Sequence, residues 1–305
     1  MDLNYFKKTR ILDGGMGQEL LAKGLISKGT LWSTSAILDE KFHQLLIDVH
    51  TSFINAGANV IVTNNFSSRK VRLIQNKVED KFEYVNKKAC ELANKAREIS
   101  KKNILIAGSL PPQNGTYVVD ERGINIIKKD FKEQAEIIKP YVDFFYLDVI
   151  SSAKEVEAAC EVTEKMNMPV LVGLHLKKNG KIASGETVTE IVKKYKTSNW
   201  IGLIGACVSL EIIENSSKEM SDLDIPFGFK ANLWSVEEPL PLHKFNRSKF
   251  NEVGKNPNDT MGRRDEITGE IFYNFAKRIK EKGANILGGC CNINPEHIKS
   301  ISSLK

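Results

Sequence analysis

Cysteine is scarce in this chain, with five among 305 residues, an odd number that cannot pair completely. The chain is also much longer than the small secreted domains that depend on disulfides for their stability. A disulfide framework is therefore excluded as the organising principle. Reduced thiols in a cytoplasmic protein are the expectation.

Long apolar runs are also lacking, and no stretch approaches the about 20 residues that a membrane-spanning helix needs. The N-terminal stretch MDLNYFKKTRIL has no apolar segment typical of a secretory signal. Charge of one sign is not concentrated either: the net charge is +6, and the lysines are spread along expected helix faces. The sequence thus predicts neither a membrane protein nor a nucleic-acid-binding surface, and it leaves the oligomeric state open.

What the sequence does contain is a regular alternation of short apolar segments and helical patterns. Eight apolar segments are typical of strands buried on both faces, at residues 10–15, 58–66, 103–110, 142–150, 169–176, 200–209, 225–233 and 284–291. Amphipathic patterns predict helices at residues 39–57, 81–99, 151–166 and 270–283. Ser152 and Glu155 have the spacing of a capping box at the start of the third of these helices.

Eight strands alternating with helices predict parallel pairing through right-handed crossovers. For one chain of this length, a closed (β/α)8 TIM barrel that comprises residues 1–305 as a single domain is the favoured architecture. An open doubly wound sheet is the alternative. Residues 234–264, after the seventh predicted strand, are expected to form a long loop with a functional role or high mobility.

Three of the five cysteines stand near the ends of predicted strands. Cys207 belongs to the sixth strand, and Cys290 and Cys291 end the eighth. In a barrel, these strand ends share one face. Three thiols meeting there leave one position of a tetrahedral zinc ion open, the arrangement of catalytic zinc. The alternative is that they are small buried side chains. Gly288 and Gly289 are expected to let the backbone approach and bend so that both neighbouring thiols face one ion.

An all-sulfur metal site has a characteristic chemistry. Three thiolates make the metal a poor source of hydroxide, whereas a fourth thiol can bind there and lose its proton. A thiolate held in this way remains nucleophilic at neutral pH. The predicted reaction class is therefore alkyl transfer to sulfur. Cys90 and Cys160 lie on apolar faces of predicted helices and are interpreted as packing residues.

Several stretches resemble the homocysteine S-methyltransferase family, zinc-dependent barrel enzymes that form methionine. They are ILDGGMGQEL, LWSTSAILDE, INAGANVIVTNNF, AGSLPP, IGACVS and NILGGCCNINPEHI, spanning residues 11–298. The GGCC doublet followed by residues 295–298 is the most specific of them. The resemblance implies two small-molecule substrates, homocysteine and a cationic methyl donor. It also implies a zinc cofactor held by Cys207, Cys290 and Cys291.

The resemblance further implies how homocysteine is bound. Asp13, Gly14 and Gly15 match the motif that lines the homocysteine site, and Asp148 stands where the family usually has a glutamate that holds the amino group. Two positions depart from the family: Asp148 is one methylene shorter, and Ala206 replaces an asparagine before the first zinc ligand. Because of these two departures, two alternatives stay open: the enzyme uses a thiol other than homocysteine, or the protein is a non-catalytic zinc-binding barrel that senses an amino acid.

The identity of the donor is also left open. Trp32 matches a tryptophan near the donor pocket, where an aromatic face attracts an onium cation. Phe66 is either a second wall of this cage or a packing residue beneath the rim. The betaine-using branch has further aromatic residues at the positions of Ser67 and Val149, so a betaine cage looks incomplete. S-methylmethionine or a related sulfonium is the preferred donor, and betaine is the alternative.

Four other polar residues receive structural interpretations. His175, at the end of the fifth strand, is interpreted as a hydrogen-bonded lining residue, and His297 as part of the start of the last helix. Arg263 and Arg264 are interpreted as solvated side chains, with contact to a substrate carboxylate as the alternative. They lie in the segment 261–270, which is expected to close the long loop over the site.

Overall fold

The computed structural model describes residues 2–305, and its centre is one sheet of eight parallel strands. The strands are β1 (Arg10–Ile11), β2 (Val60–Val62), β3 (Leu105–Leu110), β4 (Phe144–Ile150), β5 (Val170–Leu174), β6 (Trp200–Val208), β7 (Phe227–Ala231) and β8 (Ile286–Gly289). Their order in the sheet is β1-β8-β7-β6-β5-β4-β3-β2. From β2 to β8 each strand lies beside the next strand of the chain, and β1 pairs with β8.

The sheet closes between β1 and β2 just beyond the end of β1. Leu12 pairs with Val60 in a parallel bridge, and the Asp13 backbone N–H donates to the Val60 carbonyl at 3.0 Å. The Asp13 side chain adds a bond, because its carboxylate accepts from the Val62 N–H at 2.7 Å. The fold is therefore a nearly closed (β/α)8 barrel, as predicted, and the open doubly wound sheet is wrong.

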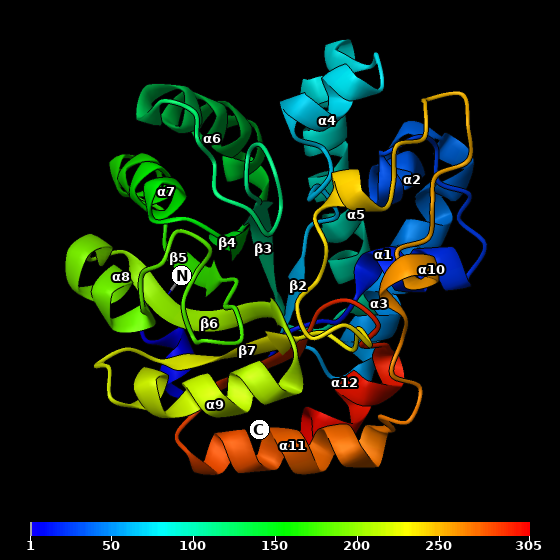
Figure 1. The fold of residues 1–305 in the computed structure, drawn as a ribbon. Helices are drawn as coiled ribbons and strands as arrows, with labels where there is room; N and C mark the ends of the chain where they lie inside the picture. The colour runs from blue at the N-terminus through cyan, green and yellow to red at the C-terminus, as the bar shows by residue number, and fades with distance from the viewer. Residues whose placement is uncertain (1) are drawn as a thin grey trace.

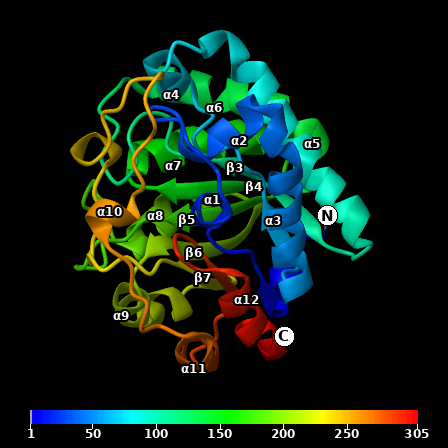
Figure 2. The ribbon, with the colours of Figure 1, turned by 90° about the vertical axis from the view of Figure 1, so that its right-hand side faces the viewer.

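Helices surround the strands (Figure 1). The α-helices are α1 (Met16–Ala22), α2 (Ser35–Leu38), α3 (His43–Ala56), α4 (Lys70–Gln75), α5 (Phe82–Ser100), α6 (Ile124–Ile138), α7 (Ala153–Lys165), α8 (Val188–Tyr195), α9 (Leu210–Ser221), α10 (Asn258–Met261), α11 (Gly269–Glu281) and α12 (Pro295–Ile301). Short 3-10 helices are η1 (Tyr5–Lys7), η2 (Trp32–Thr34), η3 (Glu40–Phe42), η4 (Glu79–Lys81), η5 (Lys139–Tyr141), η6 (Leu242–Lys244) and η7 (Ser302–Leu304). Figure 2 shows α3 between α5 and α12 on the outside of the barrel.

The four predicted helices are present as α3, α5, α7 and α11, with small shifts at their ends. Gly57 and Gly283 follow α3 and α11 with φ of +111° and +103°, the left-handed conformation that ends many helices. The predicted capping box is wrong. Ser152 Oγ donates directly to the Glu155 carboxyl at 2.7 Å, both side chains are fully buried, and the Ser152 side chain makes no capping hydrogen bond to the helix backbone.

Two apolar layers hold the barrel together. An outer layer lies between the strands and the helices, and an inner layer fills the barrel itself. Phe6, from η1, belongs to the inner layer and meets Phe144 edge to face at 5.9 Å, near the start of β4. The end of the barrel where strands begin is therefore filled, which leaves the opposite end for a pocket.

Residues 234–264 form the long loop expected after β7, and they include η6 and α10. The loop packs on the segment 27–29: the Gly29 N–H donates to Glu252 at 2.9 Å, the Gly254 N–H donates to Ser27 at 2.8 Å, and the Asn246 amide donates to Gly29 at 3.1 Å. It thus lies beside the mouth of the barrel (Figure 1). Across residues 2–305, no helix combines the length and the apolarity required to span a membrane.

Candidate metal and substrate site

Three sulfur atoms meet where β6 and β8 end. Cys207 Sγ lies 3.7 Å from Cys291 Sγ, which lies 3.9 Å from Cys290 Sγ. All three atoms lie within 4.8 Å of one another, close enough to bind one metal ion. No disulfide joins them. The structure thus brings together the three cysteines that the sequence analysis singled out.

The thiols influence each other's ionisation strongly. Burial opposes ionisation of Cys207, but hydrogen bonds from Cys290, Cys291 and Tyr117 lower its pKa well below the usual value. The hydrogen bonds to Cys207 in turn raise the pKa of Cys290 and of Cys291 well above the usual value. The protein's own groups therefore stabilise a single thiolate here. A bound divalent cation supplies the positive charge that three thiolates require.

An unusual backbone positions the residues of this region. Cys207 has φ +55° and Val149 has φ +70°, and the strand pairing shifts register at both. Such bulges redirect a side chain, and a β-branched residue rarely adopts positive φ. Trp32 and Tyr117 also have positive φ, and they line a pocket at the strand ends that contains the three cysteines. Backbone strain is therefore concentrated around the three sulfurs, as it is at many functional sites.

Gly14 and Gly15 allow β1 to pack against the turn that carries the cysteine pair. A Cβ atom on Gly14 would lie 2.3 Å from the carbonyl oxygen of Ile293, and one on Gly15 would lie 2.6 Å from that of Cys290. Gly14 and Gly15 both line the pocket that contains the three cysteines. Side chains at either position would push the two chain segments apart.

Gly288 and Gly289 also serve close packing, and the expected bend at these residues is wrong. Neither has a positive φ, and both belong to β8. Added Cβ atoms would lie 2.7 Å from Leu12 Cβ and 2.1 Å from Ile293 Cγ2. The turn itself comes later, around Asn292, whose φ is +66°.

Asp13 is paired with a lysine that the sequence analysis missed. Lys230 Nζ, at the end of β7, lies 2.5 Å from Asp13 Oδ1, and both side chains are at most 5% exposed. The Val62 N–H occupies the other carboxylate oxygen. Burial raises the pKa of Asp13, while the charge of Lys230 opposes that rise. Asp13 therefore lines the pocket, but its oxygens are engaged within the barrel.

Asp148 is the second carboxyl in the pocket. It receives a hydrogen bond from Ser109 Oγ at 2.9 Å. Burial raises its pKa to about 7, and the nearby charge of Lys230 limits the rise. Since Asp13 is already neutralised by Lys230, Asp148 is the carboxyl that remains open to a ligand in this pocket.

The pocket lies among the strand ends, and its empty space, including the part that is open to solvent, is about 620 Å³. Trp32 and Phe66 form one wall, with ring centres 6.4 Å apart and planes at 87°. Phe66 thus faces the pocket and does not pack beneath the rim. The same pocket is lined by the three cysteines, both carboxyls and Lys230.

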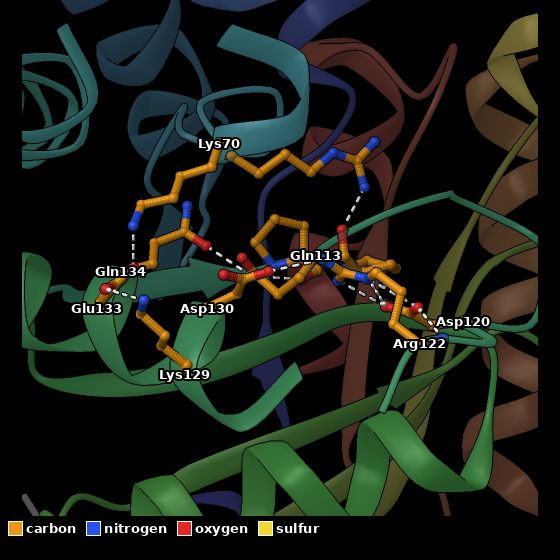
Figure 3. Close-up of polar contacts among 11 residues, drawn as sticks. Lys70, Gln113, Asp120, Arg122, Lys129, Asp130, Glu133 and Gln134 are labelled. Atoms are coloured by element: carbon orange, nitrogen blue, oxygen red, sulfur yellow. Dashed lines mark hydrogen bonds and ion pairs between the residues drawn. The ribbon is translucent and has the colours of Figure 1, made fainter. Parts of the chain in front are cut away.

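Tyr117 is a second residue that the sequence analysis missed. Its hydroxyl lies 3.3 Å from Cys207 Sγ, and its ring centre lies 4.6 Å from that of His175. It belongs to the loop between β3 and α6, which polar contacts hold in place (Figure 3). Gln113 donates to Gln134 at 2.8 Å, and Arg122 bonds both Asp120 and Asp130. A tyrosine in an irregular loop shows no local pattern that reveals such a contact.

The two departures from the family motif are both buried. Ala206 is fully buried and does not line the pocket. An amide nevertheless lies close to the first cysteine, because Asn232 Nδ2 donates to the Cys207 carbonyl at 2.6 Å and lies 3.9 Å from its sulfur. This amide comes from the end of β7 instead of β6. Ser67 and Val149, the two positions where the betaine-using branch has aromatic residues, are also buried.

His175 and His297 form hydrogen bonds within the fold. His175 is buried and bonds the Ala206 carbonyl at 3.3 Å, in agreement with a hydrogen-bonded residue. His297 lies in α12, where it contacts Asn294 Oδ1 at 2.7 Å and the Ile267 carbonyl at 2.8 Å. Burial lowers the pKa of both.

The remaining candidates lie outside the pocket. Arg263 pairs with Asp265 at 2.8 Å, and Arg264 pairs with Glu211 at 2.7 Å, so both are committed to carboxylates near the surface. Cys90 and Cys160 are buried on helices, and burial raises the pKa of each to about 12. The interpretation of these two cysteines as packing residues is confirmed.

The fold is that of a (β/α)8 barrel protein, and the three thiols that converge at its strand ends could hold one metal ion. Residues 10–304 match the sequence model of the homocysteine S-methyltransferase family. The chain belongs to this family and is a methyltransferase.

Two relatives whose names contain different methyl donors each match most of this chain. The S-methylmethionine–homocysteine S-methyltransferase BHMT2 of Pongo abelii is 28% identical over 298 residues, covering 95% of this chain and 76% of the relative. The betaine–homocysteine S-methyltransferase 1 of Bos taurus is 25% identical over 300 residues, covering 95% and 70%. The metallated homocysteine methyltransferase MmuM of Escherichia coli has the same fold, with a TM-score of 0.77, 18% identity and coverage of 98% and 96%.

Proposed function

We propose that this enzyme transfers a methyl group from a sulfonium donor, preferably S-methylmethionine, to the thiol of homocysteine, and that its metal is zinc. The observation that carries the proposal is the convergence of three thiols beside an aromatic wall. The relatives support it, because S-methylmethionine and homocysteine appear in the name of one that covers 95% of this chain.

The sulfur geometry fits zinc. In a tetrahedral site with zinc–sulfur bonds of about 2.3 Å, two sulfur ligands lie about 3.8 Å apart. The observed separations are 3.7 Å between Cys207 and Cys291 and 3.9 Å between Cys290 and Cys291, and the Cys207 and Cys290 sulfurs lie within 4.8 Å of each other. These three residues would hold the ion. When bound, zinc supplies the charge that lets a fourth thiol lose its proton at neutral pH.

The pocket supplies binding groups for both substrates. Asp148 holds the amino group of homocysteine, and Trp32 and Phe66 hold the onium centre of the donor by cation–π attraction. A bond then forms between the acceptor sulfur and the methyl carbon while the donor's carbon–sulfur bond breaks. The electron pair of the broken bond stays on the departing sulfur, so that homocysteine and S-methylmethionine give two methionines. The residues contribute by aligning the nucleophile and the methyl group.

Betaine is a second candidate donor, and the position of Tyr117 favours it. Ser67 and Val149 leave the betaine-type cage without two aromatic residues, whereas Tyr117 brings an aromatic ring into the same pocket from the loop after β3. A non-catalytic zinc-binding barrel that senses an amino acid remains the contrasting hypothesis.

The test is a donor screen with zinc-loaded protein and homocysteine, in which methionine is measured by mass with a labelled methyl group. S-methylmethionine is expected to give the fastest transfer. Cys290→Ala should lose both bound zinc and turnover, whereas the matched control Cys160→Ala should keep both. Methionine formation by metal-free Cys290→Ala contradicts the mechanism. Stoichiometric zinc without transfer from any donor favours the sensor.

A further inference from the structure

A second hollow, here called the loop chamber, adjoins the cysteine pocket. Its empty space, including the part that is open to solvent, is about 550 Å³. Trp32, Phe66, Tyr117 and Cys291 line both spaces, so the chamber extends the pocket beyond the aromatic wall. Its far side is formed by α4 and by the long loop 234–264. A donor held beside the sulfurs therefore has room to extend into it.

The charged lining of the loop chamber is entirely basic. It comprises Arg69, Arg72 and Lys255, and no Asp or Glu within residues 2–305 lines the chamber. Lys255 is exposed at the rim, whereas both arginines are buried. A buried basic lining without a carboxylate suits an anionic ligand group.

The two arginines differ in the hydrogen bonds that their guanidinium groups make. The Arg69 guanidinium donates to the Pro112 carbonyl and to Thr116 Oγ1 at 2.8 Å, so it holds the loop that carries Tyr117. Arg72 is 5% exposed, and its side chain makes one hydrogen bond within residues 2–305, to the neutral Gln75 Oε1 at 2.9 Å. The Arg69 Nε also has no partner, but both terminal nitrogens of Arg69 are occupied, so Arg72 is the guanidinium with more donors available to a ligand.

The position of Arg72 carries an energetic cost. Removing a charge from water without a partner is unfavourable, and burial together with the charge of Arg69 lowers the pKa of Arg72 to about 9. An incoming carboxylate offsets this cost, because it accepts two parallel hydrogen bonds from a guanidinium. The chamber thus pairs an aromatic wall near the sulfurs with an anion-binding group on α4.

We infer that Arg72 binds the carboxylate of the methyl donor in the loop chamber, while Trp32 and Phe66 hold its onium centre beside the cysteines. This inference rests on the proposed function and narrows it to donors that carry both an onium centre and a carboxylate. S-methylmethionine and betaine have both. Onium compounds without a carboxylate are poor donors for this enzyme.

The test compares S-methylmethionine with trimethylsulfonium, which carries a sulfonium methyl group but no carboxylate. Arg72→Gln is expected to raise the KM for S-methylmethionine about 10- to 100-fold, the effect of losing a charge-assisted hydrogen bond. The KM for homocysteine and the kcat/KM for trimethylsulfonium should stay unchanged. Arg72→Lys should recover part of the loss, because it keeps the charge without the paired donors. The control is Arg278→Gln on the exposed face of α11, where Arg278 pairs with Glu214.

Two outcomes overturn the inference: an equal loss with both donors, which marks Arg72 as structural, or no loss with either. Titration of S-methylmethionine into zinc-loaded protein distinguishes failure of this inference from failure of the proposed function. If the wild type forms no methionine but binds the compound, weaker binding to Arg72→Gln supports the site and equal binding refutes it. If the wild type does not bind the compound, the inference fails.

Discussion

Replacing Lys230 by methionine removes the positive charge beside Asp13 where the barrel closes. The pair is almost fully buried, and the Val62 N–H is the other partner of the carboxylate. Removing one partner of a buried ion pair costs about 3–5 kcal/mol. A second calculation of the loss in unfolding free energy gives a similar value. If Asp13 instead takes up a proton in the folded state, the cost at pH 7 is about 4 kcal/mol, from an ordinary pKa of about 3.9 and 1.36 kcal/mol per unit.

This cost translates into a measurable shift in the unfolding temperature. With an unfolding entropy of about 2.1 cal/mol/K per residue, 305 residues give about 0.6 kcal/mol per degree. Lys230→Met is therefore expected to unfold about 6 °C below the wild type at pH 7 in scanning calorimetry. Asp13→Asn combined with Lys230→Met should recover most of this loss, because the amide oxygen still accepts from Val62 and no charge is left unpaired.

The pH dependence gives the refuting result. In the Lys230→Met variant, the folded pKa of Asp13 lies above the unfolded pKa, so the folded state binds more protons between the two values. Stability then falls as pH rises through this window, and the deficit shrinks to about 1.5 kcal/mol at pH 5. A deficit below about 1 kcal/mol at pH 7, or one that does not change between pH 5 and pH 7, refutes the assigned role of the pair.

Two further predictions concern buried carboxyls. Burial raises the pKa of Glu155 to about 7, so the folded state loses stability as pH rises from about 4.5 to 7. Glu155→Gln should raise the unfolding temperature by about 5 °C at pH 8 and little at pH 5; an equal gain at both contradicts this reasoning. Asp148→Asn should raise the KM for homocysteine about 10- to 100-fold at saturating donor, and an unchanged KM excludes its contact with the amino group.

The sequence by itself determined the architecture. Apolar runs separated by amphipathic patterns are local properties, and burial of eight such strands between helices has few solutions. The family was also evident from local motifs, above all GGCC before residues 295–298. Because strand ends meet at one face of a barrel, the convergence of Cys207 with Cys290 and Cys291 followed from the predicted fold alone.

The tertiary structure decided which other side chains share that face with the sulfurs. Lys230 sits in an apolar run that indicates only a strand, and Tyr117 and Arg72 lie in segments without a motif. Their places beside the sulfurs and in the loop chamber depend on how distant parts of the chain pack together. The same holds for the glycines, since Gly288 and Gly289 are required by neighbours at Leu12 and Ile293. Periodicity reports which face of an element is buried, whereas close contacts depend on the register and bulges that packing sets.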